Sequence, residues 1–125
     1  MRPRHSTLTP HELAIMKVIW RLKKATVRDV YETLREQRPI AYTTIMTMMN
    51  VLEEKGFLAK MRAERAYVYR PTRSQQQVVR QMVADFVDRV FDGAASSLFV
   101  HLAKDNRLSK DERRTIRRMI EEMDE

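Results

Sequence analysis

The succession of three helical patterns and two strand patterns within residues 9–71 limits the possible folds more than any other feature of this chain. A first helix is predicted over residues 9–23, because it opens on the capping-box sequence TPHE, with proline at the first helical position. A second helix is predicted over residues 26–38, with threonine as its N-cap and a proline directly after it. A third helix is predicted over residues 43–55, because Gly56 is a typical left-handed terminator.

Two short strands are predicted after these helices. Residues 57–62 and 66–70 are rich in β-forming side chains, and the intervening residues form a predicted turn. Residues 25–27 include two β-branched side chains, so a strand of one residue pair is predicted ahead of the second helix. A helix-turn-helix followed by a β-hairpin is the winged-helix arrangement, so the sequence predicts a winged helix.

From Ser74 onward the sequence predicts three helices with wide apolar faces. The first runs from a Ser74 cap to a break at Asp92-Gly93, the second covers residues 94–104, and the third begins at the capping-box sequence SKDE at Ser109. Short helices cannot bury such faces within about 50 residues, so we expect them to pair with a second copy of the chain. The residues expected to make this dimer contact are Val79, Met82, Val83, Phe86, Val90, Leu98, Phe99, Leu102, Ile116, Met119 and Ile120.

The expected fold class is therefore mainly α with a small β-hairpin. A winged-helix DNA-binding domain is predicted over residues 1–72 and a helical dimerisation domain over residues 73–125. The charge divides in the same way: residues 1–71 hold 14 Lys and Arg against seven Asp and Glu, whereas residues 72–125 hold ten of each. A basic unit joined to a neutral one fits a polyanion-binding part and a self-associating part, although charge alone is equally compatible with a basic soluble protein.

The third predicted helix has two different sides when its residues are placed at about 100° each. The side expected to face the core consists of Ile45, Met48, Met49 and Leu52. The opposite side consists of Thr43, Thr47, Asn50 and Glu54, flanked by Met46 and Val51. This outer side is small, polar and nearly uncharged, whereas ordinary solvated helix faces are rich in Lys and Glu.

Such a surface suits the major groove of DNA. Threonine methyl groups fit thymine methyl groups, and the amide of Asn50 can pair with adenine. The hydroxyls of Thr43 and Thr44 and the free amides at the helix N-terminus suit phosphate oxygens. The simpler interpretation is a solvated helix, but the run TTIMT is a poor helix former, so helix propensity does not explain it. We therefore predict that this helix contacts bases.

The predicted hairpin supplies the basic residues of the same surface. Lys60, Arg62 and Arg65 are expected to contact phosphates, with Arg70 at the base of the hairpin and Lys55 nearby. Each of these residues fits an ordinary solvated basic hairpin equally well. Two tyrosines on the second strand, Tyr67 and Tyr69, are expected to pack against the first and third helices.

Several classes of function are disfavoured by what the sequence lacks. Cysteine is absent, which excludes disulfides and thiolate metal sites. His5, His11 and His101 are far apart and form no metal-ligand spacing, and no glycine-rich phosphate loop or serine elbow is present. We therefore expect no enzyme activity, no metal and no cofactor. Because the chain also has no secretory signal and no apolar run of about 20 residues, we expect a cytoplasmic protein without membrane insertion.

An ordered set of residues along nearly the whole chain resembles the penicillinase repressors of the BlaI/MecI/CopY type. The set comprises Leu8, Thr9, Glu12, Met16, Ile19 and Trp20, then Tyr42-Thr43-Thr44-Ile45-Met46-Thr47 with Leu52, Lys55 and Gly56, then Arg65-Ala66-Tyr67-Val68-Tyr69-Arg70-Pro71, then Phe86, Phe91-Asp92-Gly93, Ser97-Leu98 and Leu108-Ser109.

This resemblance implies a dimeric repressor that binds a palindromic DNA operator, with Thr43, Thr44 and Thr47 as carried-over DNA contacts. It also implies a membrane metalloprotease sensor as a partner that triggers cleavage of the repressor. Three features depart from the family. Val51 stands where arginine is common, His101-Leu102 aligns with a cleaved Asn-Phe bond, and the cysteine cluster of the copper-responsive branch is absent. The competing hypothesis is a winged-helix protein–protein adaptor without DNA binding, which the uneven charge disfavours.

Overall fold

The computed structural model describes residues 7–123, and it confirms the mainly helical fold class with one β-hairpin. The elements are α1 (Pro10–Leu22), α2 (Val27–Leu34), α3 (Tyr42–Glu54), β1 (Leu58–Ala63), β2 (Ala66–Pro71), α4 (Gln75–Phe91), α5 (Ala95–Lys104) and α6 (Lys110–Met123). They form two compact units, an N-terminal unit that ends at Met82 and a C-terminal unit that begins at Val83.

The helices of the N-terminal unit begin where the sequence predicts. The hydroxyl of Thr9 accepts a hydrogen bond from the Glu12 N–H at 3.2 Å, and the Glu12 carboxylate accepts one from the Thr9 N–H at 2.9 Å. Thr26 and Asp29 form the same reciprocal pair ahead of α2, at 3.1 and 2.9 Å. Both capping boxes satisfy backbone donors that the helices leave unpaired, which fixes the starting points of α1 and α2.

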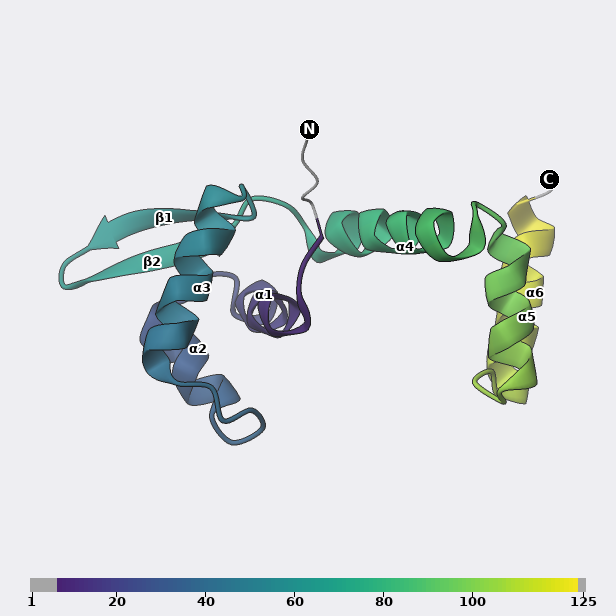
Figure 1. The fold of residues 1–125 in the computed structure, drawn as a ribbon, viewed down its shortest axis with the longest axis horizontal. Helices are drawn as coiled ribbons and strands as arrows, with labels where there is room; N and C mark the ends of the chain where they lie inside the picture. The colour runs from purple at the N-terminus through teal and green to yellow at the C-terminus, as the bar shows by residue number, and fades with distance from the viewer. Residues whose placement is uncertain (1–6, 124–125) are drawn as a thin grey trace. The chain divides into compact units, whose positions relative to one another are not determined.

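A single apolar core holds α1, α2, α3 and the hairpin together (Figure 1). Its largest fully buried side chains are Phe57, Ile15, Met16, Ile19, Ile45, Met49, Leu52 and Val30. The predicted one-pair strand is confirmed, because Ala25 and Tyr69 exchange backbone hydrogen bonds of 2.9 and 2.8 Å. This bridge fastens β2 to the segment between α1 and α2, so the base of the hairpin belongs to the core.

The hairpin itself is antiparallel, with Leu58 opposite Pro71 and Ala63 opposite Ala66. Gly56 has a φ of 89°, the left-handed conformation that ends α3 and turns the chain into β1. The strands extend away from the core beyond α3 (Figure 1), and most side chains in their outer half are exposed.

Two boundaries differ from the sequence-based expectation. α2 ends at Leu34, and the next residues form turns in which the Gln37 and Arg38 amides both donate to the Leu34 carbonyl. The N-terminal unit continues to Met82. It does so because Val78 of α4 is buried in the core and the Trp20 indole donates to the Arg73 carbonyl at 2.9 Å.

The C-terminal unit contains the end of α4, together with α5 and α6, which lie side by side (Figure 1) and line a common pocket. The predicted caps are confirmed at both helix starts: Ser74 and Gln77 form a reciprocal pair ahead of α4, and Ser109 and Glu112 form one ahead of α6. The Phe91 ring contacts both Phe86, at 5.8 Å, and His101, at 5.5 Å. Over residues 7–123 the structure shows no helix with the length and apolarity needed to cross a membrane.

Candidate nucleic-acid interface

The two sides of α3 differ as expected. Ile45, Met49 and Leu52 are fully buried, whereas Thr43, Thr44 and Thr47 are exposed. Met46 is 40% exposed beside them, and Met48, expected in the core, is only half-buried. The helix therefore holds its apolar side in the core and presents its threonines outward on a rigid element.

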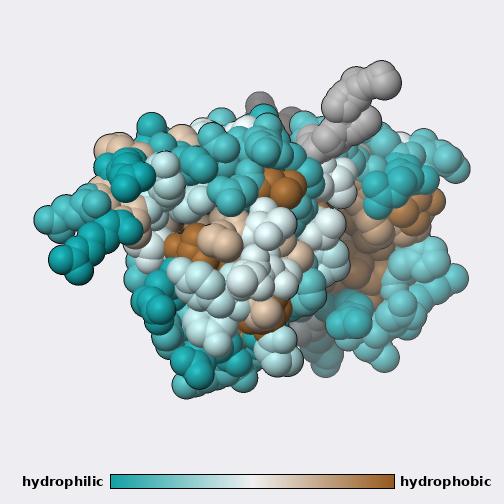
Figure 2. Space-filling model, turned by 60° about the vertical axis from the view of Figure 1, so that its left-hand side comes forward, coloured by the Kyte–Doolittle hydropathy of each residue, from teal (hydrophilic) through white to brown (hydrophobic). Residues whose placement is uncertain are grey.

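Figure 2 brings the side of the molecule that carries α3 and the hairpin forward. The centre of this side is pale, which marks residues of intermediate hydropathy, and its margin is strongly hydrophilic. Threonine is a residue of this intermediate kind. The surface thus offers uncharged groups in the middle and charged groups around them, as a base-contacting helix with a phosphate-contacting rim requires.

Asn50 occupies a different place from the one expected. The sequence puts it on the free outer side of α3, but it is half-buried at the junction with the hairpin. Its side-chain oxygen accepts a hydrogen bond from the Tyr69 hydroxyl at 2.8 Å and another from the Lys60 ammonium at 3.4 Å. Asn50 therefore connects α3 to both strands of the hairpin, a role that helix periodicity alone does not reveal.

Tyr69 is suited to hold this connection. Its side chain is buried against the core, and this burial, with a smaller contribution from Glu53, raises the pKa of the Tyr69 phenol. The hydroxyl therefore keeps its proton at neutral pH and remains a donor to Asn50.

One face of the hairpin continues the surface of α3. In the strand register Lys60 is opposite Tyr69 and Arg62 is opposite Tyr67, so these four side chains share a face. The Lys60 ammonium lies 4.7 Å and the Arg62 guanidinium 5.6 Å from the centre of the Tyr67 ring. The aromatic ring thus orders two cations next to the outward side of α3.

The expectation that Tyr67 packs against the helices is wrong, because its side chain is 42% exposed. Tyr67 lies in the outer half of the hairpin, beyond the core that buries Tyr69. The other predicted basic residues are separated from this face. Arg65 lies exposed in the turn, and Arg70 points to the opposite face of the hairpin, across from Ala59.

Lys55 is held away from the predicted phosphate contacts. Its ammonium donates to both carboxylate oxygens of Glu12, at 3.0 and 3.1 Å, and the Glu12 side chain is almost completely buried. The pair joins the C-terminal end of α3 to the N-terminal end of α1. The sequence identifies Glu12 as a capping residue but does not reveal this second partner.

Sequence reasoning also missed a cation at the start of α3. The Arg28 guanidinium, in the first turn of α2, lies 5.7 Å from the centre of the Tyr42 ring, and Tyr42 is 37% exposed. The helix dipole disfavours a positive charge in the first turn of a helix. An arginine at this position was therefore the sequence feature that could have indicated a role in binding. Arg28 extends the basic rim to the N-terminal end of α3.

No metal centre accompanies this surface. Among the residues described here, no group of three or more His, Asp or Glu side chains is arranged to hold a metal ion. His11 instead lies with its Nδ1 3.3 Å from a guanidinium nitrogen of Arg38. His5 lies outside the described residues.

Comparison with known proteins identifies the family of this chain. The model of the penicillinase repressor family matches residues 8–122, which is almost the whole chain. The protein is a member of the penicillinase repressor family. A curated relative, the transcriptional regulator BlaI of Mycobacterium tuberculosis, is 32% identical over 115 residues, covering 90% of this chain and 82% of the relative.

Solved structures of penicillinase repressors support the winged-helix assignment. The DNA-binding domain of the repressor BlaI has 28% identity and a TM-score of 0.53, covering 59% of this chain and 90% of that one. The monomeric form of Bacillus licheniformis BlaI, in complex with the blaP half-operator, has 30% identity and a TM-score of 0.50, covering 56% of this chain and 85% of that one.

In the single chain of this penicillinase repressor family member, the residues expected at the dimer contact remain partly or largely exposed to solvent. Four of the eleven, Met82, Leu98, Leu102 and Ile116, are half-buried. The others are between 39% and 56% exposed: Val79, Val83, Phe86, Val90, Phe99, Met119 and Ile120. His101 and Leu102, the pair that the resemblance is expected to place at the family's cleavage position, lie inside α5, where His101 is exposed.

Proposed function

We propose that this protein is a dimeric transcriptional repressor that binds a palindromic DNA operator through α3 and the hairpin. The observation that carries the proposal is the exposed, uncharged side of α3 next to the cations of the hairpin. An uncharged helix face with a basic margin fits a major groove between two rows of phosphates.

Within this proposal the contacts divide by chemistry. Thr47 and Met46 contact base edges and thymine methyl groups, while Thr43 and Thr44 contact phosphate at the start of α3. Lys60, Arg62, Arg65 and Arg28 contact flanking phosphates. Asn50 holds the hairpin against α3, with its amide nitrogen left to face the bases. Lys55 has no part, because Glu12 holds its ammonium.

The dimer follows from the apolar residues of the C-terminal unit and the end of the N-terminal one. Two copies related by a two-fold axis would bury these residues and place two α3 helices in successive major grooves. The structure of Bacillus licheniformis BlaI contains a monomer on a half-operator, which supports one copy for each half-site. The operator is then a palindrome, and repression follows from blocking access to the promoter.

Induction is proposed to act by loss of dimerisation. A membrane metalloprotease of the kind associated with the family is a candidate partner, but the His101-Leu102 bond differs from the cleaved family bond and lies within a helix. Membership of a repressor family supports a non-enzymatic role, and we propose a cytoplasmic location without a cofactor.

The test is operator binding by the Thr47→Ala variant, using a duplex selected from a random DNA pool with the unaltered protein. We expect the variant to bind the selected duplex at least about fivefold more weakly, with unchanged binding to random DNA, because a base contact is worth about 1–3 kcal/mol. Thr115→Ala is the matched control, since Thr115 is an exposed threonine on α6.

Equal losses on both DNAs would remove Thr47 from the base contacts. If selection recovers no preferred duplex and the protein forms no salt-sensitive complex with DNA, the adaptor hypothesis replaces the repressor.

A further inference from the structure

A basic groove between α1 and α2 takes no part in the proposed DNA surface. It has a volume of about 400 Å³, and its lining includes Ala14, Lys17, Val18 and Arg21 of α1 with Gln37 and Arg38 of the turn after α2. None of its lining residues belongs to α3 or the hairpin, and Arg28, the phosphate contact proposed on α2, does not line it. The three cations of the lining face no acidic lining residue.

These cations are also unpaired elsewhere. The ion pairs found within residues 7–123 use Arg28, Arg35, Lys55 and Arg114 as the cations. Lys17, Arg21 and Arg38 form none of them. In the described part of the structure the Arg38 guanidinium has one contact, between one of its nitrogens and Nδ1 of His11 at 3.3 Å, which leaves most of its donors unused. Three like charges gathered in one groove favour an anion within it.

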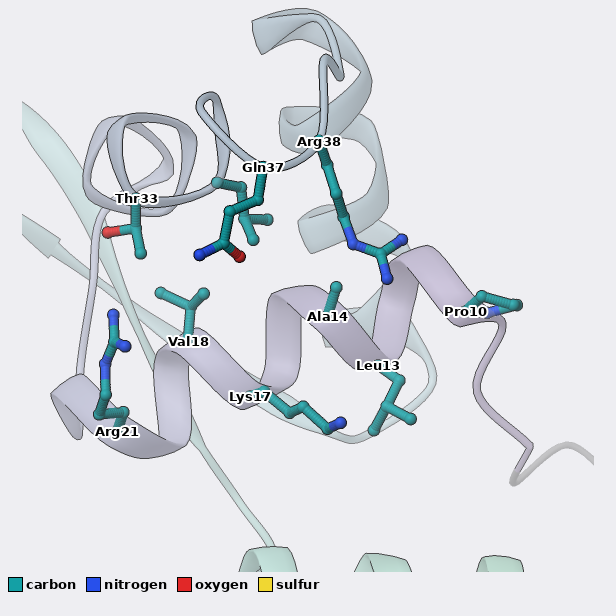
Figure 3. Close-up of a pocket in the computed structure, with 10 residues that line it drawn as sticks. Pro10, Leu13, Ala14, Lys17, Val18, Arg21, Thr33, Gln37 and Arg38 are labelled. Atoms are coloured by element: carbon teal, nitrogen blue, oxygen red, sulfur yellow. The ribbon is translucent and has the colours of Figure 1, made fainter.

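The close-up in Figure 3 shows how the groove is arranged. Arg21 and Arg38 reach into it from opposite ends, and the Gln37 side chain points into it between them. The floor between the two guanidinium groups is formed by Ala14 and Val18 of α1. The groove thus has a basic group at each end and an apolar surface with one amide in the middle.

We propose that this groove binds a small organic dianion, a dicarboxylate with a short apolar spacer. Each guanidinium offers a planar pair of donors that matches one carboxylate. The Ala14 and Val18 side chains cover the methylene groups of the spacer, and the Gln37 amide donates to one of the carboxylates. Lys17 adds a third positive charge at the edge. A ligand held this way joins α1 to the turn after α2 and stabilises the N-terminal unit.

The test is calorimetric titration of the full chain with linear dicarboxylates from malonate to suberate, at constant ionic strength. Hexanoate, with one carboxylate, and inorganic phosphate are the comparison ligands. We expect one member of the dicarboxylate series to bind saturably with one site per chain, and hexanoate and phosphate to bind at least tenfold more weakly. The same dicarboxylate is expected to raise the Tm of the protein.

Two variants locate the binding site. Arg21→Gln and Arg38→Gln should each weaken dicarboxylate binding at least tenfold, because each removes one charge-assisted contact at one end of the groove. Arg107→Gln is the matched control, an exposed arginine of the C-terminal unit, and should bind as the unaltered protein does. Circular dichroism checks that all three variants fold.

Several results would overturn the proposal. One is the absence of saturable binding by any dicarboxylate, and another is binding that both groove variants leave unchanged. A third is phosphate binding as tightly as the best dicarboxylate, which indicates a site for any anion. If Arg21→Gln and Arg38→Gln instead weaken operator binding and reduce its salt dependence, the groove cations contact DNA phosphates.

Discussion

The N-terminal and C-terminal units differ in how completely a single chain buries its apolar residues. In the N-terminal unit eight large side chains are fully buried by residues of the same unit. In the C-terminal unit neither α5 nor α6 has a buried residue, although Phe99, Met119 and Ile120 are large and apolar. The N-terminal unit thus has an apolar core of its own, whereas the C-terminal unit leaves large apolar side chains exposed in the single chain.

The charges of the two units support the same division of roles. Residues 1–82 hold 16 Lys and Arg against seven Asp and Glu, whereas residues 83–125 hold eight against ten. A nearly balanced apolar surface permits two copies to associate without strong repulsion, and a basic surface attracts a polyanion. This difference supports the proposed roles, DNA binding for the N-terminal unit and assembly for the C-terminal unit, with operator binding dependent on both.

The largest effect is expected from a charge placed on the uncovered surface. Ile120→Glu should convert the dimer to a monomer, because Ile120 is 50% exposed in the single chain and apolar area must be buried to hold two copies together. Loss of the second half-site contact should then weaken operator binding by a factor on the order of 100 or more. Light scattering measures the mass and a gel shift measures the affinity.

Leu22→Glu is the control for this variant. Leu22 is 41% exposed but belongs to the N-terminal unit, so the same substitution there should leave a dimer. A monomeric unaltered protein, or an Ile120→Glu protein that remains dimeric, contradicts the assignment of the C-terminal unit to assembly.

A smaller effect is expected from removing one buried side chain in each unit. Met49→Ala should reduce the free energy of unfolding by about 2–5 kcal/mol, because Met49 is fully buried and its loss leaves a cavity. Phe99→Ala should cost much less in dilute solution, where we expect the proposed dimer to dissociate, because Phe99 is 43% exposed in the single chain. Urea denaturation at two protein concentrations measures both.

The dependence of each stability cost on protein concentration distinguishes burial within one chain from burial between two chains. The cost of Met49→Ala should be the same at both concentrations, whereas the cost of Phe99→Ala should rise where the dimer is present. A large and concentration-independent cost for Phe99→Ala means that the C-terminal unit buries this ring within one chain.

Sequence patterns were sufficient for most of the N-terminal fold, because capping boxes and helical spacing are local features. Thr9 and Thr26 lie at the predicted helix starts, and Ala25 forms the predicted bridge. In the C-terminal unit Ser109 likewise lies at the predicted start of α6. The outward placement of Thr47 also follows from periodicity alone.

Side-chain contacts between residues far apart in the chain could not be predicted from the sequence. The Asn50–Tyr69 and Lys55–Glu12 contacts join residues 19 and 43 positions apart, and no local pattern predicts them. Tyr67 was misplaced for a related reason: strand alternation assigns its face correctly but does not tell how far along the hairpin the core extends. Such partners depend on the tertiary packing of the helices against the strands.

The smallest effect is expected at the junction between α3 and the hairpin. Tyr69→Phe removes the hydroxyl that donates to Asn50, and one such bond is worth about 0.5–1.5 kcal/mol. We expect a loss of that size in unfolding free energy and a few-fold loss of operator affinity, because the hairpin is held less firmly beside α3. Tyr67→Phe is the matched control, since the Tyr67 hydroxyl has no hydrogen bond in the described part of the structure.

The pH dependence of stability tests the burial of the Tyr69 phenol, separately from its hydrogen bond to Asn50. Burial raises the pKa of Tyr69, so the folded protein favours the protonated phenol. Its contribution to stability is present below the unfolded pKa of about 10 and is lost as the pH rises through the folded pKa. The Tyr69→Phe protein should lack this alkaline loss, whereas the Tyr67→Phe protein should retain it. If the Tyr69→Phe protein keeps the same alkaline loss of stability as the unaltered protein, the buried Tyr69 phenol is not the group responsible for that loss.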